Sequence, residues 1–179
     1  EIYQEGMRIP PIKILEKGEI NKPLLEVLLS NMRVRDERLG DFNSSLAACK
    51  TAERRLNELT SRYSMQVMLD CVDLNLRRSE NRMRENINAL PNGQYYYEDY
   101  METFGPDGFE PLLLPLNLTI TDDEMTADFT GASPQVPAPV NSTLAVTAAS
   151  VYIALKSTLD PAHALNHGSF RPLHVVAPE

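Results

Sequence analysis

Apolar and small residues recur at alternating spacings of three and four along two consecutive stretches of the chain. The first stretch runs from Phe42 to Tyr63, and the second follows Ser64 and reaches Leu90. This spacing places these residues on one face of a helix. Pro91-Asn92-Gly93 ends the second helix, because proline removes a backbone donor and Asn-Gly favours a turn. We predict a long antiparallel helical hairpin over residues 35–92, with one bent helix as the alternative.

The segments on either side of this hairpin have different patterns. Residues 1–34 are rich in proline, glycine and charged residues. They predict an extended segment with one short strand near residues 12–15, followed by a short helix that begins at Lys22-Pro23. After residue 93, apolar and aromatic runs bounded by turn residues predict strands. These strands cover residues 94–101, 112–120, 125–129 and 171–176.

An alanine- and valine-rich stretch from Leu144 to Thr158 predicts one more helix, which Asn141-Ser142-Thr143 can cap. The stretch is apolar on several faces, so we expect this helix to be buried. The expected fold class is α+β, with the long helical hairpin followed by a mostly antiparallel sheet and the buried helix. The three segments, residues 1–34, 35–92 and 93–179, are expected to belong to one larger domain.

Composition and charge argue against two classes of binding partner, nucleic acids and membranes. With 25 acidic and 17 basic residues the formal net charge is −8, whereas a nucleic-acid surface needs a basic face. No apolar run approaches the roughly 20 residues that span a bilayer, and no secretory signal is visible at the start. We expect no nucleic-acid or membrane partner and a cytoplasmic location. Cys49 and Cys71 lie in the apolar helical stripes, which predicts buried free thiols.

The two ends of the sequence are unusual for a complete protein. The chain begins with Glu1 rather than Met, and it stops at Ala177-Pro178-Glu179, next to a predicted strand. We expect an internal piece of a longer polypeptide.

Several short segments combine glycine or proline with a charged or amide side chain, as is typical of loops that hold a polar group in place. Glu5 and Arg8 flank such a segment and fit either a site or a structural ion pair. Asp41 follows Gly40, and glycine allows the close approach of a ligand or of another backbone. Asp128 ends a predicted strand before a glycine loop, where a site and a simple turn explain the residues equally well.

Other chemistry-bearing residues form no recognisable constellation. His163 and His167 have a spacing that binds metal ions on a helix, but the intervening Asn166 and the neighbouring Pro161 and Gly168 favour a loop. The sequence contains neither a nucleotide-phosphate loop nor a nucleophile elbow. The residues alone therefore predict no self-sufficient catalytic centre.

The order and spacing of the irregular segments resemble the hydantoinase B/5-oxoprolinase family along nearly the whole chain. The segments that carry the resemblance are Glu5-Gly6, Arg8-Ile9-Pro10-Pro11, Asn31-Met32-Arg33, Gly40-Asp41, Pro91-Asn92-Gly93, Asp128-Phe129-Thr130-Gly131, Gln135, Pro139-Val140-Asn141, Asn166-His167-Gly168, Arg171-Pro172 and Ala177-Pro178-Glu179. The family includes B-type components of ATP-dependent N-methylhydantoinases, part of 5-oxoprolinases, and subunits of acetone and acetophenone carboxylases. Phe42-Asn43-Ser44-Ser45 departs from its usual Ala-Gln pair, which puts the substrate class in doubt.

The resemblance implies an ATP-dependent cyclic-amide hydrolase that opens the ring of a substrate phosphorylated by its partner. The partner is an A-type subunit or domain, which uses the ATP, so a hetero-oligomer is expected. A divalent metal is expected in a segment upstream of this chain, and no cofactor is expected to bind here. There are two alternatives. The first is a subunit of a related ketone carboxylase, and the second is a non-catalytic assembly module whose helical hairpin docks on another subunit. Alone, the chain is expected to be inactive.

The resemblance also suggests which residues line the site. Asp41 and Asp128 are the candidates for catalytic roles. The candidates for substrate binding are Glu5, Arg8, Arg33, Asn141, Asn166 and Arg171. We expect the arginines to orient the substrate and hold an anionic group, since a guanidinium can bind a phosphate or a carboxylate bidentately, and the amides to donate hydrogen bonds. No metal ligand is predicted in this chain.

Overall fold

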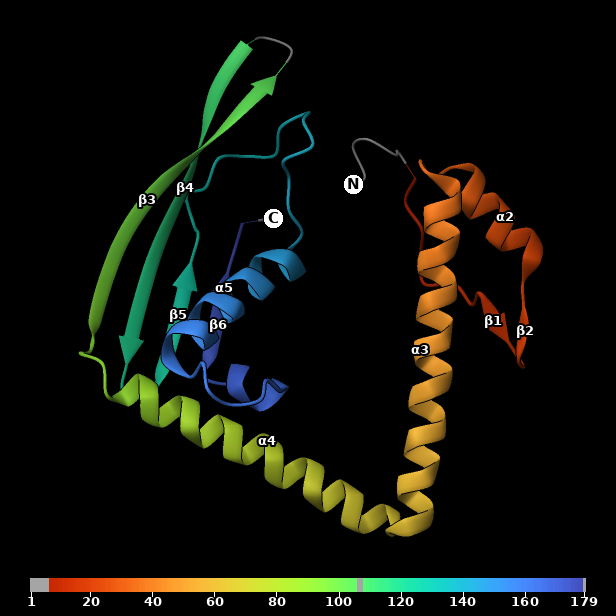
Figure 1. The fold of residues 1–179 in the computed structure, drawn as a ribbon. Helices are drawn as coiled ribbons and strands as arrows, with labels where there is room; N and C mark the ends of the chain where they lie inside the picture. Colours follow the sequence, from red (N-terminus) through yellow and green to blue (C-terminus); the bar gives the residue numbers. More distant parts are fainter. Residues whose placement is uncertain (1–6, 106–107, 179) are drawn as a thin grey trace. The chain divides into compact units, whose positions relative to one another are not determined.

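The structure is a computed structural model that describes residues 7–105 and 108–178, without the side chains of residues 103–110. The chain divides between Met65 and Gln66 into two compact units. Figure 1 traces the backbone of both units.

The first unit contains a small hairpin and two helices. Strands β1 (Leu15–Glu16) and β2 (Glu19–Ile20) pair antiparallel around Lys17-Gly18, where both residues have positive φ. Helix α2 (Lys22–Ser30) begins at the predicted Lys22-Pro23. The side chain of Asn21 caps it by accepting a hydrogen bond from the Leu24 amide at 3.2 Å. The buried face of α2 consists of Leu25, Leu28 and Leu29.

Helix α3 (Arg35–Arg62) completes the first unit and is exposed along its length. None of its residues, all of which the structure describes, is buried. Its solvent face carries helical ion pairs such as Arg54–Glu58 at 2.7 Å. The prediction of a buried thiol at Cys49 is wrong, because Cys49 is an exposed free cysteine on a helix that has no buried residue among those described.

The second unit is built on a mixed four-stranded sheet. Its strands are β3 (Gly93–Gly105), β4 (Gly108–Thr121), β5 (Glu124–Asp128) and β6 (Leu173–Val176), in that spatial order. The first two pairings are antiparallel and the last is parallel. Pro115 is tolerated in β4 because β5 pairs only from Asn117 onward, so this proline leaves no bond of the β4–β5 ladder unmade.

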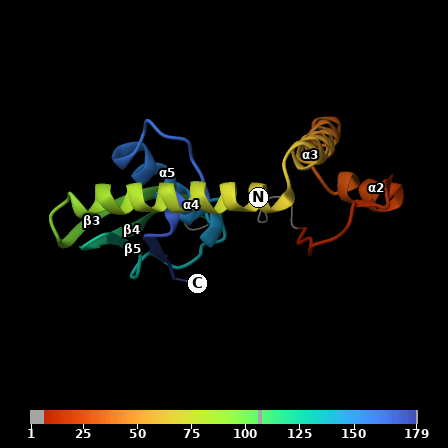
Figure 2. The same ribbon diagram turned by 90° about the horizontal axis from the view of Figure 1, so that it is seen from below.

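Two helices cover this sheet. Helix α4 (Met65–Asn88) passes across the end where β4 finishes and β5 begins, while α5 (Leu144–Leu159) lies over one face (Figures 1 and 2). The core between them is a cluster of five buried side chains from α4 and the strands. These are Met83, Ile87, Ile120, Met125 and Leu173, with Tyr152, Leu155 and Phe170 packed against them.

The α+β class and the mostly antiparallel sheet are confirmed. Both long helices form, but they belong to different units, so their packing as a hairpin stays a prediction. Helix α5, described along its whole length, is only partly covered: Lys156 is its one buried residue, Tyr152 and Leu155 are half-buried against the core, and Leu144, Val146 and Ile153 are exposed. The prediction of a buried Cys71 is wrong, because it lies on the exposed first half of α4. No helix in the described ranges has both the length and the apolarity needed to cross a membrane.

Candidate functional site

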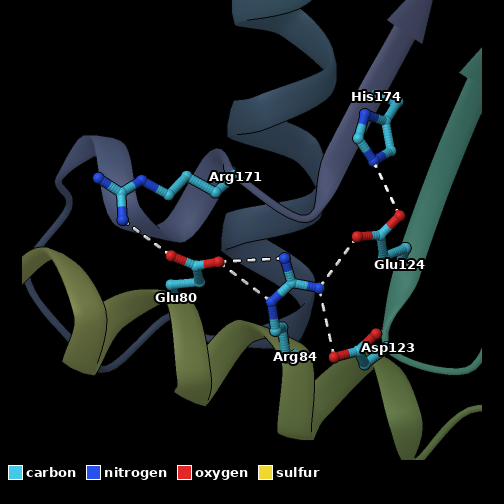
Figure 3. Close-up of polar contacts among 6 residues, drawn as sticks. All are labelled: Glu80, Arg84, Asp123, Glu124, Arg171 and His174. Atoms are coloured by element: carbon cyan, nitrogen blue, oxygen red, sulfur yellow. Dashed lines mark hydrogen bonds and ion pairs between the residues drawn. The ribbon is translucent and has the colours of Figure 1, made fainter.

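A network of charged side chains joins α4 to the start of β5 and to the segment before β6 (Figure 3). Glu80 of α4 accepts hydrogen bonds from Arg171 at 2.9 Å and from Arg84 at 3.0 Å. Arg84 also reaches two carboxylates of the β4–β5 turn, Asp123 at 3.2 Å and Glu124 at 3.1 Å. These contacts link positions up to 91 residues apart in sequence.

The network extends to β6, and its hydrogen bonds lower the pKa of Glu80 and of Glu124. His174 on β6 lies 3.2 Å from Glu124 through its Nε2 atom. The hydrogen bond from Arg171, helped by Arg84, lowers the pKa of Glu80 although partial burial acts against it. Hydrogen bonds from Arg84 and His174 likewise lower the pKa of Glu124. At neutral pH both carboxylates are therefore hydrogen-bond acceptors rather than proton donors.

Arg171, a predicted substrate-binding residue, lies at the edge of this network. Its Nη1 atom contacts Glu80, and its side chain is 37% exposed. A guanidinium carries five N–H donors, so Arg171 keeps donors that can face an anionic group. The arrangement is compatible with the predicted anion-holding role.

Asn166 holds the neighbouring turn against the same helix. Its Nδ2 donates to the Ser79 hydroxyl of α4 at 2.7 Å, and its Oδ1 accepts from the Gly168 amide at 2.9 Å, which caps the short 3-10 helix η1 (His167–Phe170). A Cβ on Gly168 would lie 2.0 Å from the carbonyl oxygen of Leu76. The Asn166-His167-Gly168 motif is thus a docking element that sets Arg171 beside Glu80.

Asn141 closes the loop that follows β5. Its Oδ1 accepts from the Val136 amide at 3.0 Å, and its Nδ2 donates to the carbonyls of Val136 at 2.7 Å and Ala138 at 3.1 Å. This loop and β4 enclose a cavity of about 340 Å³ whose lining includes Gln135 and Asn141. Because its amide is engaged with the backbone, Asn141 shapes this cavity through the loop.

Asp128, a predicted catalytic residue, ends β5. Its Oδ1 accepts a hydrogen bond from the Thr130 amide at 2.8 Å, and Gly131 follows with φ +96°. Hydrogen bonds from the Thr130 side chain and backbone lower the pKa of Asp128. It is an ionised carboxylate in a tight turn, available as a hydrogen-bond acceptor.

The remaining candidates belong to the first unit. Asp41 of α3 is exposed and forms an ion pair with Arg38 at 2.8 Å. Arg8 and Arg33 are also exposed, and Glu5 lies outside the described residues. The structure therefore brings Asn166 and Arg171 together on α4, whereas Asp128 and Asn141 lie elsewhere in the second unit.

The model of the family described as Hydantoinase B/oxoprolinase matches residues 1–179. The chain belongs to this family. It is 31% identical to the beta subunit of the caprolactamase of Pseudomonas jessenii, over 98% of this chain and 30% of that protein. It is 30% identical to the B-type subunit of a putative D-/L-hydantoinase of a Pseudomonas species, over all of this chain and 32% of that protein. The chain thus spans about a third of the length of these relatives.

A solved structure shows the same fold. The crystal structure of the ATP-dependent caprolactamase from Pseudomonas jessenii matches with a TM-score of 0.88 and 30% identity, over all of this chain and 31% of that chain. The relatives are named as enzymes of cyclic amides and as subunits of such enzymes.

Glu80, Arg84 and Glu124 are not among the residues predicted to form the site. Glu80 and Arg84 lie four apart on one helical face, a spacing that predicts a local ion pair. Their contacts with Arg171 and Glu124 depend on how α4 packs against the sheet and the segment before β6, and the spacing of residues in the sequence does not predict this packing.

The divalent metal expected from the resemblance stays a prediction, and it is not expected to bind this chain. In residues 7–105 and 108–178, no group of three or more His, Cys, Asp or Glu side chains could hold a metal ion.

Proposed function

We propose that this hydantoinase B-family chain forms part of the component that opens the ring of a cyclic amide in an ATP-dependent hydrolase. The observation that carries the proposal is the match of the whole chain to an ATP-dependent caprolactamase, with a TM-score of 0.88 at 30% identity. The hydantoinase relative supports the same class of reaction. Because the chain spans about a third of these relatives, activity belongs to the polypeptide that carries it rather than to these residues alone.

The proposed chemistry uses phosphorylation to activate an unreactive bond. An amide C–N bond in a ring resists water, because its carbonyl is a poor electrophile. In our proposal an A-type partner transfers a phosphoryl group from ATP to the carbonyl oxygen and releases ADP, which makes the carbonyl carbon a better electrophile. Water then adds to this carbon, the C–N bond breaks as the nitrogen takes up a proton, and a second water hydrolyses the resulting acyl phosphate to the carboxylate and phosphate. The chain described here then helps to hold the activated substrate, and a divalent metal would be supplied by another segment of the polypeptide.

Within this scheme, the arginines hold anionic groups. Arg171 is the clearest candidate, because Glu80 fixes its Nη1 side and leaves other donors to face a phosphate or carboxylate. Arg8 and Arg33 are proposed for the same task, and Glu5, Asn141 and Asn166 for binding or positioning the substrate. Asp41 and Asp128 are proposed as acceptors close to the reacting atoms.

The test is an activity assay on the natural polypeptide that carries this sequence, produced with its A-type partner. Hydantoin, 5-oxoproline and caprolactam are supplied with ATP, and ring-opened product is measured together with ADP. The proposal expects product that depends on ATP and on both proteins. Carboxylation of acetone or acetophenone with bicarbonate, without ring opening of any amide, would replace it by the carboxylase alternative.

A pair of variants distinguishes substrate binding by Arg171 from a nonspecific effect of removing an exposed arginine. Arg171→Ala should lower kcat/KM by about tenfold or more, as expected for a lost hydrogen bond to a charged group. Arg54→Ala is the matched control, because Arg54 is an exposed arginine that pairs only with Glu58 on its own helix among the described residues. If both variants keep the wild-type kcat and KM, Arg171 does not bind substrate.

The assembly alternative is favoured by one observation. The second half of α3 and the first half of α4 expose large apolar side chains, among them Leu56, Leu69 and Leu74. Replacing Leu69 and Leu74 by Gln should weaken association with the partner in a co-purification assay if these helices serve assembly. Unchanged association, with turnover intact, would remove this role.

A further inference from the structure

A buried charge cluster closes the C-terminal end of α5, away from the network around Glu80. Lys156 and Asp160 are only 7% and 6% exposed. The Lys156 ammonium contacts the Asp160 carboxylate at 2.9 Å, the Asp160 carbonyl, and the His163 carbonyl at 2.9 Å. The other carboxylate oxygen of Asp160 lies 2.6 Å from Nδ1 of His163. The cluster therefore links a buried ion pair to a histidine ring.

The ion pair determines which nitrogen of His163 carries the proton. Burial raises the pKa of Asp160, but hydrogen bonds from Lys156 and His163 outweigh it and lower that pKa. An ionised carboxylate can only accept hydrogen bonds, so Nδ1 of His163 donates to it. In the neutral ring this leaves the lone pair on Nε2, as in the carboxylate–histidine pairs that orient an imidazole in other proteins.

The oriented ring lies at a cavity. A hollow of about 280 Å³ is lined by Ile153, Lys156 and Ser157 of α5 and by Pro161, His163 and Leu165 of the following loop. The His163 side chain is 53% exposed, and its contact with Asp160 uses Nδ1, which leaves Nε2 on the other side of the ring. Ile153 and Leu165 are 62% and 58% exposed, so the walls are apolar surface in contact with solvent.

The chemistry of this hollow limits what it can hold. The charge of Lys156 is neutralised by Asp160, and the ammonium already has three acceptors. While the His163 ring is neutral, an anion or a cation therefore finds no free counter-charge among the lining residues. Of the other lining residues, Ser157 and His163 carry side chains that can still form a hydrogen bond, the latter through Nε2 of the neutral ring, and Ile153, Pro161 and Leu165 are apolar. A neutral molecule with an apolar body and one N–H or O–H donor is complementary to this combination.

We propose that the hollow beside α5 is a binding site for a small uncharged molecule that donates one N–H or O–H hydrogen bond to Nε2 of His163. Asp160 is the positioning residue that fixes the ring. Closing the C-terminal end of α5 explains why Lys156 binds the carbonyls of Asp160 and His163, but it does not require the imidazole that Asp160 orients beside the hollow. The site stands independently of the proposed ring-opening activity, although cyclic amides belong to this class of ligand.

The first test measures the reactivity of the histidines with diethyl pyrocarbonate, which acylates a neutral ring nitrogen, in the natural polypeptide. Mass spectrometry follows His163, His167 and His174 separately in one reaction. The probe is 2-pyrrolidinone, which has an N–H donor, and its matched control is N-methyl-2-pyrrolidinone, which lacks that donor. We expect saturable protection of His163 by the first compound, much weaker protection by the second, and no protection of His167 or His174.

A second test uses calorimetry on two variants. His163→Gln should weaken the binding of 2-pyrrolidinone by about threefold to tenfold, the effect of one neutral hydrogen bond. His167→Gln removes a nearby exposed histidine that does not line the hollow and should leave binding unchanged. The proposal is overturned if His163 is unreactive, if both compounds protect it equally, or if His163→Gln binds as tightly as the wild type.

Discussion

The substitution Gly168→Ala tests the docking of η1 on α4 most directly. The added Cβ would lie 2.0 Å from the carbonyl oxygen of Leu76, 2.7 Å from its carbonyl carbon and 2.9 Å from its Cα. All three are backbone atoms of a helix, so no side-chain rotation can relieve the clash. The turn must move away from α4, which strains the Asn166–Ser79 bond and the Arg171–Glu80 pair.

The expected loss of stability follows from these contacts. Overpacking against a rigid neighbour costs about 1–3 kcal/mol, and losing the partly buried Asn166–Ser79 hydrogen bond adds about 1 kcal/mol. The Arg171–Glu80 pair adds little, because Arg171 is partly exposed and solvent screens the pair. We expect Gly168→Ala to lower the free energy of unfolding by about 2–4 kcal/mol in urea denaturation.

The sign of the stability change distinguishes the predicted clash from the ordinary effect of replacing glycine by alanine. Gly168 does not have a positive φ in the structure, so without the clash alanine would stabilise the fold by restricting the unfolded chain. Gly40 of α3 is the matched control, because a Cβ there meets nothing within 4 Å. Gly40→Ala should raise the free energy of unfolding by up to about 1 kcal/mol. A Gly168→Ala protein as stable as the wild type would refute the close packing of η1 on α4.

Three further predictions concern charge and thiols. Because the folded-state pKa of Glu80 is lowered, its contribution to the free energy of unfolding is present at neutral pH and is lost as the pH falls through that pKa. The loss of stability caused by Glu80→Gln, measured in urea, should therefore be largest near neutral pH and should shrink below about pH 4. A difference in stability between variant and wild type that does not change with pH would contradict this prediction. Lys156→Met leaves the carboxylate of Asp160 buried without its cation and should lower the free energy of unfolding by about 3–5 kcal/mol in urea denaturation. A variant as stable as the wild type would mean that the pair is not buried. Cys49 and Cys71 should both react with a thiol reagent without denaturant, as free exposed cysteines, and thiols that react only after unfolding would show that these helices are covered.

Most of the secondary structure could be predicted because its signals are local. The helix at residues 144–159 and the end of α4 before Pro91 follow from spacing and turn residues. The β3–β4 hairpin is longer than predicted, with 13- and 14-residue strands, because pairing continues through positions of weak strand propensity. The parallel pairing of β5 with β6 joins segments about 45 residues apart, and no local pattern encodes such a crossover.

In the candidate site, too, some residues could be predicted from the sequence, whereas their contacts could not. Asn166 and Arg171 could be identified from the special residues around them, but their partners Ser79 and Glu80 lie 87 and 91 positions away. Whether Asp128, Asn141, Arg8, Arg33 and Asp41 contact substrate stays a prediction, as does the role of Glu5. Burial is overestimated for both cysteines, because an apolar stripe shows that a helix can be covered and not that it is.

The sequence by itself determined most of the helices and strands, the acidic charge and the order of motifs that places the chain in the hydantoinase B family. These properties depend on neighbours within a few positions, or on the residues themselves. Only the tertiary structure decided that Gly168 packs on the backbone of Leu76, that Glu80 holds Arg171, and that the Asp160 carboxylate orients His163 at a cavity. Such contacts arise from the packing of whole elements, whose relative positions depend on the combined shape of many side chains.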